Sequence, residues 1–159
     1  MITFTPMSDT DYPDYLAYFI PDYAKEIVEN YRLTEEAALQ HAATEIGASL
    51  PEGVNTPGQT LLTLVRDSAD AVGYLWYKAD PLLKSVYVND FYIFPQYRNQ
   101  GLGRLALAQL EHNLRDQGYQ QIKLRVAAGN KTAQHVYAAS GFNVTGINMN
   151  KLLSSACRL

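Results

Sequence analysis

Residues 85–104 read SVYVNDFYIFPQYRNQGLGR, a strand pattern that leads through a glycine loop into the start of a helix. Positions 85–94 are rich in β-branched and aromatic residues, which predicts the longest strand of the chain. Pro95 ends that strand, and apolar residues at a helical spacing predict a helix over 102–117. Glycines just before a helix let backbone N–H groups approach a ligand, so the loop predicts an anion site.

The segments on both sides predict a mixed α/β (α+β) domain around one sheet. Further strands are expected at 2–5, 60–65, 71–77, 121–126, 142–147 and 148–153. Further helices are expected at 11–31 with an interruption at Pro21, at 34–50 with Thr34 as N-cap, and at 130–140 with Asn130 as N-cap. No repeat or linker divides the chain, so we expect residues 1–159 to form a single domain.

Composition and short sequence features argue against several classes of partner and location. The net charge of −3 argues against a nucleic-acid partner, which needs a basic face. The chain has no apolar run of the roughly 18 residues that cross a membrane, and its N-terminus does not resemble a signal peptide. The single cysteine, Cys157, has no internal disulfide partner and no nearby histidine, so we interpret it as incidental. These observations predict a cytoplasmic protein that does not bind membranes.

Taken alone, the glycine loop has three interpretations. It fits an ordinary turn before a helix, and GLGRLA also fits a loose dinucleotide-binding fingerprint. That fingerprint needs its first glycine at the strand end, whereas residues 95–100 separate Gly101 from the strand, and no acidic residue ends the next strand. A P-loop is excluded because no Gly-Lys-Ser/Thr follows. The third interpretation is a pyrophosphate loop of another kind, to which Arg98 and Arg104 add positive charge.

Two motifs together favour the third interpretation. Residues 92–103 resemble the acyl-coenzyme A loop of the GNAT superfamily of N-acetyltransferases, Arg/Gln-x-x-Gly-x-Gly/Ala after a long strand. Residues 124–142 resemble the family's second motif, in which Asn130 is followed seven residues later by Tyr137 and then by a closing Gly-Phe. This resemblance implies a single mixed, mostly antiparallel sheet with a V-shaped splay between the two central strands, flanked by helices.

The resemblance also implies acetyl-CoA as the co-substrate and no metal. It places the pantetheine arm beside the strand end and the pyrophosphate in the loop. The strand end is Phe91, Tyr92 and Ile93, and the loop is Arg98, Asn99, Gln100, Gly101, Leu102, Gly103 and Arg104. Asn130 would contact the coenzyme near its pantetheine, and Tyr137 would face the thioester sulfur.

The chemistry of amide formation suggests roles for three side chains. Tyr137 would be the general acid for the departing thiolate, because a phenol stays protonated at neutral pH. An ammonium must also lose a proton, and Asp90 is the first candidate base because an acid in an apolar strand is rarely there for packing. Glu26 on the N-terminal helix is the second candidate. A backbone N–H near Ile93 would stabilise the oxyanion.

We therefore expect an enzyme that moves an acetyl group from acetyl-CoA to a primary amine of a small molecule or peptide. Arg125 stands where relatives that acetylate protein N-termini carry a glutamate base, which disfavours that branch. A non-catalytic acyl-CoA-binding sensor with the same fold is the alternative. Because C-terminal strands often pair between subunits in this family, a homodimer is a further hypothesis.

Overall fold

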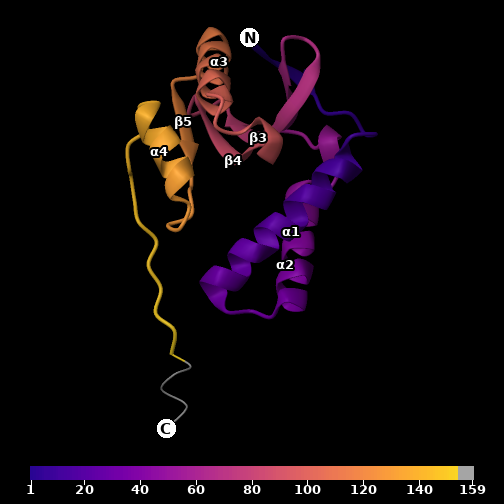
Figure 1. Ribbon diagram of the computed structural model, residues 1–159, viewed down its shortest axis with the longest axis vertical. Helices are drawn as coiled ribbons and strands as arrows, with labels where there is room; N and C mark the ends of the chain where they lie inside the picture. The colour runs from indigo at the N-terminus through magenta and orange to yellow at the C-terminus, as the bar shows by residue number, and fades with distance from the viewer. Residues whose placement is uncertain (154–159) are drawn as a thin grey trace.

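The computed structural model describes residues 1–153, which form a five-stranded sheet and four α-helices (Figure 1). The elements are β1 (Ile2–Pro6), α1 (Tyr12–Tyr31), α2 (Glu35–Ser49), β2 (Gln59–Arg66), β3 (Asp70–Asp80), β4 (Ser85–Ile93), α3 (Leu102–Asp116), β5 (Gln121–Leu124) and α4 (Lys131–Ala139). The strand order is β1-β2-β3-β4-β5, with antiparallel pairing up to β4 and parallel pairing between β4 and β5. The predicted mixed, mostly antiparallel sheet is confirmed.

Local capping signals predicted two helix starts correctly. The Thr34 side chain accepts a hydrogen bond from the Ala37 N–H (3.1 Å), and the Asn130 side chain accepts one from the Ala133 N–H (3.1 Å). Each bond satisfies one backbone donor that the first helical turn leaves without an intrahelical partner. Both helices therefore begin where a short polar side chain replaces the missing acceptor.

The predicted interruption at Pro21 is wrong, because α1 runs through it without a break. Proline removes one backbone donor inside the helix, which normally favours a break. The two halves of α1 are nevertheless both held by packing. Tyr15 in the first half is fully buried near the sheet, and Ile27 in the second half is buried against α2.

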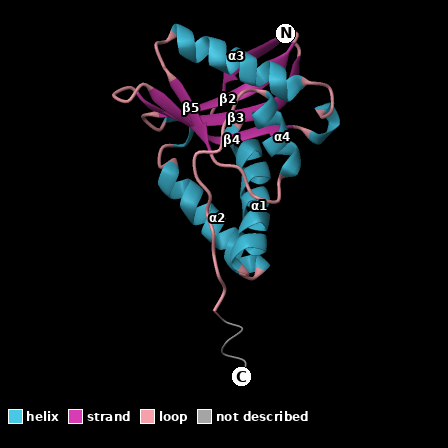
Figure 2. Ribbon diagram, turned by 90° about the vertical axis from the view of Figure 1, so that its left-hand side faces the viewer, coloured by secondary structure: helices cyan, strands magenta, loops and turns pink. Residues whose placement is uncertain are grey.

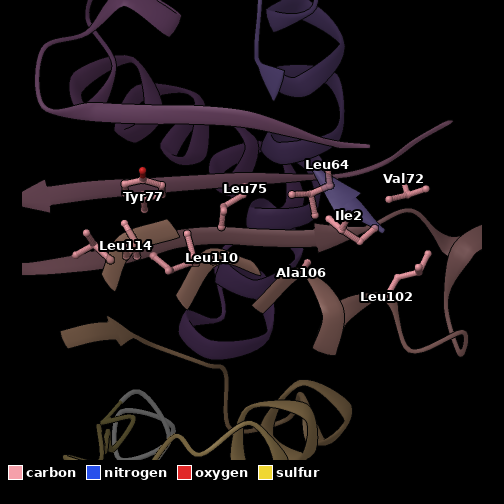
Figure 3. Close-up of a cluster of buried hydrophobic side chains, with 11 residues drawn as sticks. Ile2, Leu64, Val72, Leu75, Tyr77, Leu102, Ala106, Leu110 and Leu114 are labelled. Atoms are coloured by element: carbon pink, nitrogen blue, oxygen red, sulfur yellow. The ribbon is translucent and has the colours of Figure 1, made fainter. Parts of the chain in front are cut away.

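Helices cover both faces of the sheet (Figure 2). On one face, the apolar side of α3 packs on β2, β3 and β4, and Figure 3 shows Leu110 and Leu114 reaching toward Leu75 and Tyr77 of β3. On the other face, Trp76 from β3 packs with Tyr15. Because neighbouring side chains of a strand point to opposite faces, β3 contributes Leu75 and Tyr77 to one core and Trp76 to the other.

The two central strands diverge, as the predicted splay requires. β4 and β5 pair only between 85–88 and 121–124, while β4 continues to Ile93 with β3 as its one partner strand. Against β3, Trp76 pairs with Asp90 and Tyr77 with Val88, so Asn89 is an extra residue that makes a bulge. The bulge lies where the pairing of β4 with β5 ends.

The predicted strands over 142–147 and 148–153 are wrong, because the structure assigns no strand to those residues. The segment runs extended away from α4 (Figure 1), and Val144, Ile147 and Met149 are largely exposed. A strand needs hydrogen bonds from a neighbour, and residues 143–153 run beside no sheet edge. Their β-propensity alone therefore did not make a strand.

Two observations concern the described residues as a whole. None of the helices in 1–153 combines the length and apolar character that crossing a membrane requires. Within the same range, no group of three or more His, Cys, Asp or Glu side chains is arranged to hold a metal ion. Cys157 lies outside the described residues.

Candidate active site

Asp90 occupies the bulge of β4 and accepts hydrogen bonds from two tyrosines of α1. The Tyr15 hydroxyl donates to Oδ2 (2.8 Å), and the Tyr18 hydroxyl donates to Oδ1 (3.1 Å). Each carboxylate oxygen therefore has a phenol partner that comes from more than 70 residues earlier in the chain. Since Tyr15 has no exposed surface and Tyr18 is half-buried, the two partners differ in access to solvent.

The surroundings of Asp90 favour its neutral form. Desolvation raises the pKa of Asp90 to about 7, although the hydrogen bonds from Tyr15 and Tyr18 act in the opposite direction. The nearby charge of Asp22 raises that pKa further. A carboxyl group with a pKa near neutrality can take up and release a proton under ordinary conditions.

An aromatic cluster lines the α1 side of the strand end. Tyr18 stacks on Tyr92 with ring centroids 3.7 Å apart, and Tyr74 lies 5.8 Å from Tyr18 and 5.0 Å from Phe94. These four rings are half-buried, so each keeps a face or an edge toward solvent. Tyr92 and Asp90 are two residues apart on one strand and face α1 together.

Tyr137 lies on the other side of the same strand end. Its ring is 6.4 Å from Phe91 and 5.5 Å from Phe142. Burial and the charge of Asp90 raise the pKa of Tyr137 to about 12, so its hydroxyl stays protonated at neutral pH.

The glycine loop follows β4 and has the backbone geometry of an anion site. Asn99 and Gly101 adopt positive φ angles of 62° and 75°, and Gly101 is the N-cap of α3. Such turns let successive N–H groups converge just before a helix, whose N-terminus also favours negative charge. The loop is braced from β2, because Arg66 donates to the Gln100 side chain (3.0 Å).

Two side-chain contacts connect the loop to the strand end. The Arg98 guanidinium donates to the Ile93 carbonyl oxygen (2.9 Å) and lies 5.1 Å from the centre of the Tyr92 ring. Leu102 is buried in the core, and Gly103 packs beside Phe91 and Val136, while Arg104 is exposed at the first turn of α3. The loop and the strand end thus form one continuous surface.

Asn130 and Glu26, the remaining predicted site residues, both have structural partners. The Asn130 cap fixes the start of α4 and so sets the position of Tyr137, seven residues later. Glu26 accepts a hydrogen bond from Arg125 (2.9 Å) in an ion pair between α1 and the residue after β5. Asp90 lies on β4 and Tyr137 packs near Phe91 of the same strand, whereas Glu26 is engaged in its ion pair with Arg125.

Sequence reasoning missed Tyr15 and Tyr18, the partners of Asp90. Tyr12, Tyr15 and Tyr18 recur every three residues, which puts an aromatic stripe on one side of α1. That spacing predicts that one face of the helix is buried. It does not identify the carboxylate that the stripe meets, because that contact depends on the tertiary fold.

Comparison with known proteins identifies the family that shares this architecture. Residues 19–142 match the Acetyltransferase (GNAT) family. The uncharacterized N-acetyltransferase YycN of Bacillus subtilis is 34% identical over 157 residues, which cover 96% of this chain and 99% of YycN. The crystal structure of YycN agrees with a TM-score of 0.91 at 33% identity, over 96% of this chain and 99% of that chain.

Two structures of lower identity share the fold. The PaiA N-acetyltransferase of Thermoplasma acidophilum, solved with coenzyme A, has a TM-score of 0.69 at 16% identity over 93% of each chain. The spermidine N-acetyltransferase of Vibrio cholerae, solved with coenzyme A and spermine, has a TM-score of 0.64 at 15% identity, over 91% of this chain and 82% of that chain. The family match and the full-length similarity to YycN support one conclusion: this chain is an acyltransferase of the GNAT acetyltransferase family.

Proposed function

We propose that the protein transfers the acetyl group of acetyl-CoA to a primary amine of a small molecule or peptide by direct attack. The observation that carries the proposal is that the end of β4 left uncovered by β5 has two groups beside it: Asp90, bound by two tyrosine hydroxyls of α1, and Tyr137, which packs near Phe91. One has a pKa near 7 and the other a pKa near 12, so one group accepts a proton at neutral pH while the other holds one.

Asp90 is the proposed general base. An alkylammonium has a pKa of about 10.4 and must lose a proton before its nitrogen can attack a carbonyl carbon. Asp90 takes that proton and releases it to solvent after turnover. Glu26 remains the second candidate, but its ion pair with Arg125 occupies one of its oxygens, which favours Asp90.

Tyr137 is the proposed general acid. As the C–S bond breaks, the phenol gives its proton to the sulfur, and the proton that the attacking nitrogen loses on collapse restores the phenol. The Ile93 N–H, at the end of β4 that β5 leaves uncovered, is the proposed donor to the oxyanion. The balance is one ammonium and one thioester in, one amide, one thiol and one proton out.

The residues proposed to hold the coenzyme fit that co-substrate. A pyrophosphate would bind to the backbone from Arg98 to Arg104, where positive φ angles and a helix start favour an anion. The pantetheine arm would lie along Phe91, Tyr92 and Ile93, which β5 leaves uncovered. Asn130 would contact it from the start of α4.

The test is release of free thiol from acetyl-CoA in the presence of polyamines, amino acids, aminoglycosides and peptides. Tyr137→Phe should lower turnover about 10- to 1000-fold, the usual range for loss of a general acid. Tyr87→Phe, which changes an exposed tyrosine of β4, is the matched control and should keep wild-type turnover. Tight coenzyme binding without thiol release from any amine would instead favour the sensor function.

We also propose that the protein is a homodimer in which residues 143–153 of one copy pair with β5 of the other. Two features support this: β5 has no partner on its outer edge among residues 1–153, and a groove beside it is lined by Leu114, Tyr119, Ile122 and Phe142. Light scattering should give a dimer for the wild type and a monomer for Ile147→Asp. Leu82→Asp, an equally exposed site in the β3–β4 turn, should stay dimeric, and a monomeric wild type would contradict the proposal.

A further inference from the structure

The two tyrosines that bind Asp90 differ in their surroundings. Tyr15 is fully buried, and its ring is enclosed by Tyr12, Phe19 and Tyr74 at centroid distances of 6.4, 5.7 and 5.0 Å. Its hydroxyl has Asp90 as a partner at 2.8 Å and no route to a ligand. Tyr15 can therefore hold the carboxyl in place but cannot contact an acceptor.

Tyr18 occupies the position between Asp90 and the strand end. Its hydroxyl donates to Oδ1 of Asp90 (3.1 Å), while its ring stacks on Tyr92 at 3.7 Å. Tyr92 belongs to the strand end that is proposed to run beside the pantetheine. The half-buried Tyr18 is thus in contact both with the proposed base and with the surface where the acceptor amine would react.

We propose that Tyr18 is a catalytic residue that relays the proton of the acceptor ammonium to Asp90, while Tyr15 is a positioning residue. This inference rests on the proposed function and extends it. In the relay, an ammonium N–H bond breaks and the proton joins the Tyr18 oxygen. At the same time the Tyr18 O–H bond breaks and its proton joins Oδ1 of Asp90, so Tyr18 ends unchanged and Asp90 becomes a neutral acid.

The electrostatics require the two transfers to be concerted. Burial and the charges of Asp90 and Asp22 raise the pKa of Tyr18 far above its ordinary value, so a free phenolate does not form. The titratable groups around the relay are Tyr15 and Asp22 from α1, Tyr92 from β4 and Tyr137 from α4. Tyr18 thus passes the proton on without changing its own protonation state, and Asp90 is the group that becomes protonated.

Matched hydroxyl deletions test this division of roles. Thiol release is measured from pH 5.5 to 9.5 for the wild type, Tyr15→Phe and Tyr18→Phe, with 1,5-diaminopentane as acceptor. Tyr15→Phe removes a hydrogen bond from the carboxylate, so the midpoint of its rising kcat/KM profile should move to higher pH while the plateau stays within about threefold of wild type. Tyr18→Phe should lose about 10- to 1000-fold on the plateau itself.

A second acceptor amine distinguishes two causes of a Tyr18→Phe defect, loss of the proton relay and a general structural defect. Glycinamide has an amino pKa near 8, so above that pH it supplies the free amine and does not need the relay. The defect of Tyr18→Phe should therefore be at least about tenfold smaller with glycinamide than with the diamine. A structural defect would affect both acceptors equally, and thermal unfolding of each variant checks the fold directly.

Three results would overturn the relay while leaving the acetyltransferase proposal intact. They are coincident profiles for Tyr15→Phe and Tyr18→Phe, a wild-type plateau in Tyr18→Phe, and an equal loss with both acceptors. Absence of transfer by the wild type to every amine of the panel would instead overturn the proposed function, and the relay would fall with it.

Discussion

Replacing Asp90 with asparagine should stabilise the protein above neutral pH. Desolvation raises the pKa of Asp90 from 3.8 to about 7 in the folded chain, a difference of about three pH units. At about 1.36 kcal/mol per unit this corresponds to about 4 kcal/mol. Because the residue is half-buried and keeps some contact with water, we expect about 2 to 4 kcal/mol.

The sign follows from proton binding in the two states. Between about pH 4 and 7 the folded protein keeps a proton on Asp90 that the unfolded chain has lost, so raising the pH lowers the free energy of unfolding. Asparagine resembles the protonated acid and can still pair with both tyrosine hydroxyls, one as donor and one as acceptor. The stability advantage of Asp90→Asn should therefore be small near pH 4.5 and reach its full value above pH 7.

Urea unfolding at several pH values between 4.5 and 8.5 measures this difference. Asp14→Asn is the control, because Asp14 is an exposed carboxylate in the first turn of α1. That change should cost less than about 1 kcal/mol at neutral pH, since a carboxylate there stabilises the helix. An advantage for Asp90→Asn that does not change with pH, or that shrinks as the pH rises, would refute the reasoning.

Three further predictions concern glycine positions and helix caps. Gly101→Ala should weaken acetyl-CoA binding measured by calorimetry, because φ is +75° at this position and an alanine there strains the loop. Gly103→Ala is the control and should bind acetyl-CoA normally, because a Cβ there makes only ordinary contacts near 3.8 Å. Gly73→Ala should lower the free energy of unfolding by about 1–3 kcal/mol in urea titrations, since a Cβ would overlap the Tyr92 carbonyl oxygen; wild-type stability would contradict that close approach. Asn130→Ala and Thr34→Ala should each cost about 1 kcal/mol of stability as lost helix caps, and only Asn130→Ala should also weaken acetyl-CoA binding.

Features encoded by neighbouring residues were predictable from the sequence. The caps at Thr34 and Asn130, the glycine loop and the long strand before it depend on contacts within a few residues. The resemblance to the family added the splay and the position of Tyr137 relative to β4. The caps and the splay are confirmed, whereas β4, predicted as the longest strand, has 9 residues and is shorter than β3 with 11. The role of Tyr137 stays a prediction.

Features that depend on distant contacts were not predictable. Pro21 favours a helix break locally, but burial of both halves of α1 outweighs that preference. The apolar residues of 143–153 favour strands locally, but strand formation needs a neighbouring edge. The link from Tyr15 and Tyr18 to Asp90 spans more than 70 residues, and no pattern near either end indicates it.

The division of α1 between two cores has a consequence for how the fold tolerates mutation. Its first half packs on the sheet, whereas Ala24 and Ile27 pack only with Ala38 and Ala42 of α2, in a cluster without any strand residue. The apolar contacts at the far end of the α1–α2 hairpin, which projects below the sheet in Figure 1, are thus made between helices. Two polar contacts also connect that end to the rest of the chain: Arg125 donates to Glu26, and Asn150 donates to the Asn30 carbonyl oxygen. Mutations in this helix–helix cluster can therefore change the hairpin while the core between β4 and α3 keeps its packing.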